Sequence, residues 1–124
     1  MIILGLPLVA FDPLYRVTTI EEIQQSKPNC TVLLDNIDEP LVQYIQKQDI
    51  SFALHVESIK DACIANAIGA KYIIVPKKLS KKAQDIATEY LFDTKILILI
   101  EHEDEIEHAA SDSIDGVIFT KAIV

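Results

Sequence analysis

The sequence has little glycine and no tryptophan, with three glycines and two cysteines among 124 residues. No GxGxxG or Walker pattern is present, which excludes the usual glycine-rich phosphate loops of nucleotide-binding proteins. The two cysteines, Cys30 and Cys63, have neither the CxxC spacing of a redox pair nor a histidine close in sequence. We expect two buried, reduced thiols, and we expect neither a metal site nor a cofactor.

Positive charge is also scarce: the chain has 11 basic and 19 acidic residues, which give it a net charge of -8. Such a field repels phosphate backbones, so nucleic acid is excluded as a partner. No apolar run reaches the roughly 20 residues that span a bilayer, so no membrane association is expected. The apolar residues 1–10 lack a preceding Lys or Arg and a small-residue cleavage pattern, so we read them as retained. These features predict a cytoplasmic, acidic protein.

What the chain does contain is a repeated apolar run. Five such runs begin 20 to 24 residues apart and are rich in Val, Ile, Leu and Phe, at residues 31–35, 51–56, 71–75, 95–101 and 116–119. Continuous rather than alternating apolar residues are typical of strands that are buried on both faces of a parallel sheet. A sixth strand is expected within residues 2–11, where Gly5 and Pro7 leave its register open.

The segments between these strands have helical signals. Thr18 with Glu21, and Ser58 with Asp61, form candidate capping boxes. Asp38 is placed to cap a helix over residues 39–48, and Gly69 to end a helix over residues 59–68. A fourth helix is expected from an apolar stripe at i, i+3, i+4, i+7 and i+8, formed by Ala83, Ile86, Ala87, Tyr90 and Leu91.

Strands and helices that alternate at this interval predict one α/β domain over residues 1–124, with a parallel sheet of about six strands and about five helices. Two closures of the sheet are open. The first choice is an open, doubly wound sheet of the flavodoxin or Rossmann type, because six strands are fewer than the eight that normally close a barrel. The second is a partial β/α barrel, and a homodimer that covers an edge strand is compatible with either.

The C-terminal half resembles a known group of proteins. The stretches GAKYIIVPK at 69–77 and SIDGVIFTKAIV at 113–124 are similar to the later units of phosphate-binding β/α (TIM-type) barrels, such as the thiamine-phosphate synthase and keto-deoxy-phosphogluconate aldolase families. The resemblance implies a barrel-type fold, with a phosphate held by a Gly-Ser pair after the last strand. Here Thr120 and Lys121 stand in place of that pair, so the phosphate-binding glycine is missing.

Polar residues follow each predicted strand, where ligands of parallel α/β proteins bind. We take as candidate ligand-binding residues Asp35, Asn36, His55, Glu57 and Thr120. Candidate catalytic residues are Lys77, Lys121, His102 and Glu101, in which a lysine would act as a Schiff-base nucleophile and a carboxylate or histidine would carry the proton. The alternative is that these residues are polar only because the chain emerges into water at strand ends.

Glu105 and His108 have the i, i+3 spacing of helical di-metal sites, but the chain offers no further carboxylate helices, so we expect a solvated acidic face there. Since no complete site is present, the leading hypothesis is a small soluble domain without catalytic activity, which acts through protein contacts or self-association. The alternative is a protein that binds a small anionic metabolite, a carboxylate or phosphate, or a lyase or aldolase-like enzyme that uses the strand-end residues.

Overall fold

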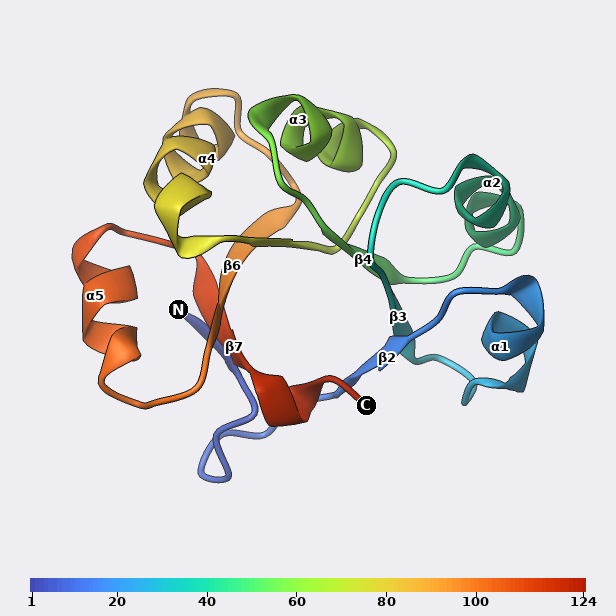
Figure 1. The fold of residues 1–124 in the computed structure, drawn as a ribbon, viewed down its shortest axis with the longest axis horizontal. Coiled ribbons are helices and arrows are strands. Elements are labelled where there is room, and N and C mark those ends of the chain that lie inside the picture. The colour runs from blue at the N-terminus through green and yellow to red at the C-terminus, as the bar shows by residue number, and fades with distance from the viewer.

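A computed structural model describes all of residues 1–124 as one parallel sheet of seven strands with five helices, and the sheet is strongly curled (Figure 1). The strands are β1 (Ile2–Leu4), β2 (Leu14–Arg16), β3 (Thr31–Leu34), β4 (Phe52–His55), β5 (Tyr72–Val75), β6 (Lys95–Ile100) and β7 (Gly116–Phe119). The helices are α1 (Ile20–Gln25), α2 (Glu39–Lys47), α3 (Ile59–Ala67), α4 (Lys77–Glu89) and α5 (Glu105–Ser111), and a 3₁₀ turn, Thr120–Ala122, follows β7. None of the helices combines the length and apolarity needed to cross a membrane.

The predicted parallel α/β architecture is confirmed, and of the two closures the chain adopts the partial barrel. Strands β2 to β7 lie side by side in sequence order, and β1 pairs with β7 at the far edge. Right-handed crossovers between sequential strands place every helix on the same face, and Figure 1 shows all five helices outside the curled sheet. A doubly wound sheet needs a reversal of strand order, which this chain does not make.

The last residues of the chain bring the two edges of the sheet together. Ile123 pairs in parallel with Leu14 of β2. The backbone N–H of Arg16 donates to the carbonyl oxygen of Val124 at 3.0 Å, and the N–H of Val124 donates to the carbonyl oxygen of Leu14 at 2.9 Å. The 3₁₀ turn therefore leads the chain from β7 across to β2, beside the end of β1, where Gly5 approaches Ala122.

The curled sheet has an apolar core on each face. The outer core, between sheet and helices, contains 24 buried residues. The inner core is much smaller, and each strand contributes one buried residue to it, with Ala122 as the eighth member: Leu4, Leu14, Leu33, Ala53, Ile74, Leu97, Ile118 and Ala122. Because neighbouring side chains of a strand point to opposite faces, this inner set also identifies which residues further along each strand point inward.

The structure differs from the sequence-based expectations at several local points. A seventh strand, β2, was not predicted, because Pro13 precedes it and it has only three residues. The cap of α1 lies one residue later than expected: Thr19 accepts from Glu22 N–H, and the Glu22 carboxylate accepts from Thr18 N–H at 3.0 Å. Asp38 and Ser58 do cap α2 and α3, and Gly69 adopts a φ of 91° as predicted.

Two further expectations about burial were wrong. The apolar stripe on α4 ends early, because the helix stops at Glu89 and Leu91 turns away with a φ of 54°. Tyr90 and Leu91 are consequently 73% and 84% exposed. Both cysteines are free thiols, but Cys63 lies on the exposed side of α3 and only Cys30 is partly buried.

Candidate functional site

All the strand-end candidates lie at one end of the barrel, which we call the mouth: the end at which the parallel strands finish at their carboxyl termini. Two groups of side chains gather there. One surrounds a cavity on the side of β6, β7 and the loop after β1, and the other lies at the ends of β2, β3 and β4.

The first group lines a cavity of about 530 Å³, which we call the Lys121 cavity. Its lining residues are Leu6, Pro7, Glu101, His102, Glu103, Phe119, Thr120 and Lys121. The structure thus brings together three of the four predicted catalytic residues and one predicted ligand-binding residue, although they are separate in sequence. A cavity of this size is within the range that holds small metabolites.

On the β6 side of this cavity, the carboxylate of Glu105 holds the turn that follows the strand. One oxygen of Glu105, Oε2, accepts the backbone N–H of Glu101 at 2.9 Å and that of His102 at 3.0 Å. These two N–H groups, Glu101 first, lower the pKa of the Glu105 carboxyl below its usual value. Glu105 therefore fixes the turn that carries Glu101 and His102. His108 does not pair with Glu105; its Nε2 lies 3.5 Å from Asp112 Oδ2.

Lys121 is the cation of the cavity and has no carboxylate partner. Its amino group lies 5.9 Å from the centre of the Phe119 ring, and no ion pair involves it. The side chain is exposed, as is that of Lys77, which begins α4 and does not line the cavity. A Schiff-base lysine needs desolvation to become nucleophilic. The geometry fits Lys121 as a charge anchor better than as a nucleophile.

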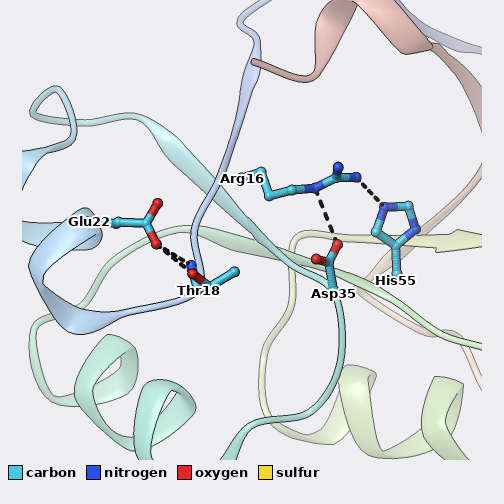
Figure 2. Close-up of polar contacts among 5 residues, drawn as sticks. All are labelled: Arg16, Thr18, Glu22, Asp35 and His55. Atoms are coloured by element: carbon cyan, nitrogen blue, oxygen red, sulfur yellow. Dashed lines mark hydrogen bonds and ion pairs between the residues drawn. The ribbon is translucent and has the colours of Figure 1, made fainter.

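The second group, which we call the Arg16 cluster, consists of Arg16, Asp35 and His55 (Figure 2). Each lies two residues beyond an inner-core residue of its own strand, Leu14, Leu33 and Ala53 respectively, so all three face the inside of the barrel. Arg16 Nε lies 3.2 Å from Asp35 Oδ1, and Arg16 Nη2 lies 3.5 Å from His55 Nε2. Figure 2 shows the guanidinium between the carboxylate and the imidazole.

Burial sets the protonation state of His55. Desolvation is the largest effect and lowers the pKa of this half-buried imidazole below its usual value. Asp35 opposes the effect, Arg16 adds to it, and Glu57 opposes it. The neutral ring then accepts the Arg16 N–H at Nε2, which places its own proton on Nδ1.

The sequence located most of these residues but missed the central one. Asp35 and His55 were predicted, whereas Arg16, the only arginine of the chain, was not, because its strand was not recognised. Glu57 acts on the cluster through its charge alone. Asn36 is exposed beyond β3 and belongs to neither group.

No group of three or more His, Cys, Asp or Glu side chains is arranged to hold a metal ion. Comparison of the chain with protein families finds no family that matches, and comparison with curated proteins finds no significant relative.

Proposed function

We propose that the protein is a binding protein for a small anionic metabolite, a carboxylate or a phosphate ester, which it holds at the barrel mouth. The observation that carries the proposal is the Lys121 cavity, in which an unpaired cation and the Thr120 hydroxyl face a space of about 530 Å³. The location agrees with the general position of ligands at the carboxyl ends of parallel strands.

The charges of the cavity favour one anchoring point for the anion. Lys121 supplies the only fixed positive charge among the lining residues, while Glu101 and Glu103 are acidic. An anionic group is therefore attracted to the Thr120–Lys121 side, and the hydroxyls or amines of a ligand suit the acidic side. In the barrel families that the C-terminal half resembles, the phosphate is held after the last strand, which is the position of Thr120 and Lys121 here.

Loss of the Lys121 charge is expected to weaken binding of the anion at least about tenfold, because a hydrogen bond to a charged group contributes about 1.5–3 kcal/mol. We would screen phosphorylated sugars and keto acids by thermal shift and measure hits by calorimetry with the wild type and Lys121→Gln. Lys47→Gln, at the C-terminal end of α2, removes the same charge at the opposite end of the barrel and should leave affinity unchanged. Equal binding by all three proteins would contradict the proposal, and so would a screen in which no compound stabilises the wild type.

A second candidate function, self-association, is favoured by the loop between β1 and β2. This loop carries Leu8, which is 92% exposed, next to Val9 and Phe11 at 36% each. No helix connects β1 to β2, and Figure 1 shows a loop on that side of the barrel where the other connections have helices. Neighbouring apolar side chains in water favour association, and a second copy of the chain would bury them.

Leu8→Asp is expected to shift a homodimer to monomers, since it places a charge at the centre of the apolar loop. Sedimentation equilibrium over a hundredfold range of protein concentration would measure the change, with Leu91→Asp as a control at another highly exposed leucine, which follows α4 and is 84% exposed. A wild type that stays monomeric at the highest concentration would end this proposal and leave ligand binding untouched.

We also infer a cytoplasmic location. Cys30 and Cys63 are both free, and an exposed thiol such as Cys63 persists best in a reducing compartment.

A further inference from the structure

The Arg16 cluster lies at the mouth but outside the lining of the Lys121 cavity. Several hydrogen-bond donors of Arg16 have no partner within the protein. A guanidinium has five N–H donors in a planar fork. In the protein, the Arg16 side chain contacts only Asp35, through Nε, and His55, through Nη2. The remaining N–H groups are free, and their planar arrangement matches the oxygens of a carboxylate or phosphate.

The ion pair of the cluster contributes little to the stability of the fold. The side chains of Arg16 and Asp35 each retain 49% of their exposure. Exposed ion pairs typically contribute about 0–1 kcal/mol, so a ligand can rearrange this one at low cost.

The net charge of the cluster depends on His55. With His55 neutral, Arg16 and Asp35 cancel, and Glu57 is the other charge that acts on the imidazole. The register partner of His55 on β5 is Ile74, which is uncharged. A proton on Nε2 of His55 would break its contact with the Arg16 N–H, because both groups would then be donors. An anion placed between the guanidinium and the imidazolium accepts from both and removes that conflict.

We propose that Arg16 and His55 form a second anion-binding subsite at the mouth, which takes up one proton on His55 when a carboxylate or phosphate group of the ligand binds. The step is a simple addition: the anion accepts hydrogen bonds from the guanidinium and from the new imidazolium, and the proton comes from the acid form of the buffer, whose conjugate base stays in solution. The subsite deepens the proposed function and rests on it, because Lys121 and Arg16 both lie at the mouth, on either side of the junction between the last residues of the chain and β2. A ligand that uses both carries two acidic groups.

Sulfate tests the subsite directly, because it stays dianionic through the titration range of histidine and stands in for phosphate. We would follow the ring protons of His55, His102 and His108 by NMR from pH 4.5 to 8.5, in sulfate and in chloride at equal ionic strength. The pKa of His55 is expected to rise by about one pH unit in sulfate, which corresponds to about tenfold tighter binding to the protonated form. His108, on the outer helix α5, is the control, and its ring-proton signals should be the same in sulfate and in chloride.

Two variants make the test specific. Arg16→Gln should abolish the response of His55 to sulfate, while Asp35→Asn, which removes the competing carboxylate, should increase affinity for sulfate several-fold. A rise of the His55 pKa that persists in Arg16→Gln would overturn the proposal. If sulfate shifts the amide signals of Thr120 and Lys121 but leaves His55 unmoved, the second subsite is wrong and the cavity function stands.

Discussion

Gly116→Ala is expected to lower the free energy of unfolding by about 1–3 kcal/mol and to loosen β1 from the sheet. A Cβ at Gly116 would lie 2.5 Å from the carbonyl oxygen of Ile2, 2.6 Å from Ile2 Cβ and 2.8 Å from Leu97 Cδ2. Two of these atoms belong to the paired strand β1 and lie on or next to its backbone, so they cannot move without breaking the Ile2–Gly116 register. Urea denaturation would measure the loss of stability.

A control at Gly69 separates crowding from backbone strain. A Cβ at Gly69 meets no atom within 4 Å, but the residue has a φ of 91°. Gly69→Ala should therefore cost only about 1–2 kcal/mol through its left-handed backbone and leave β1 intact. Hydrogen exchange at Ile2, whose N–H donates to the carbonyl oxygen of Asp115 beside Gly116, reports on the pairing of β1 with β7: rapid exchange is expected in Gly116→Ala and native protection in Gly69→Ala. Native protection in both would show that the interior tolerates a methyl group at Gly116.

Leu97→Ala is expected to cost about 2–5 kcal/mol, the largest effect of a single side-chain truncation that we predict. Leu97 is fully buried in the inner core, where each strand provides only one residue. A curled sheet cannot collapse toward a hole at its centre without changing the hydrogen-bond register of every strand, so the cavity stays open.

Leu99→Ala provides a matched control on the same strand and the same face. Leu99 lies two residues closer to the mouth and is 40% exposed, so its truncation should cost less than about 1.5 kcal/mol. Both variants would be unfolded in urea under identical conditions. Similar losses for the two would show that the inner core does not determine stability and that the outer core alone holds the sheet.

Much of the architecture could be predicted because β3 to β7 are continuous apolar runs at a regular interval. For the same reason, the sequence could not predict which residues of each strand point inward, because Val, Ile and Leu occur on both faces. Only small residues, Ala53 and Gly116, signal the narrow interior. Strand β2 was missed because three residues after a proline give no periodicity, and Arg16 was missed with it.

The location of the candidate residues at the mouth could be predicted, but their grouping could not. Parallel strands place their carboxyl ends together, so the sequence alone predicts that Glu101, His102 and Lys121 lie at the same end of the sheet. The partition into a cavity and a separate cluster depends on the curl of the sheet and on the 3₁₀ turn after β7, neither of which has a sequence signal here. Cap placement failed at α1 for a simpler reason, since Thr18 and Thr19 are chemically identical candidates.

The junction of the two sheet edges by Ile123 and Val124 has a consequence for how the protein folds. Pairs from β2–β3 through β6–β7 join segments close in sequence and can form progressively, whereas this junction and the β1–β7 pair each close a loop of almost the whole chain. Loop closure of that length has a high entropic cost, so both contacts should form after the folding transition state and open first under native conditions. Arg16 and Lys121 lie on either side of that seam, and a ligand that bridges them would slow its opening.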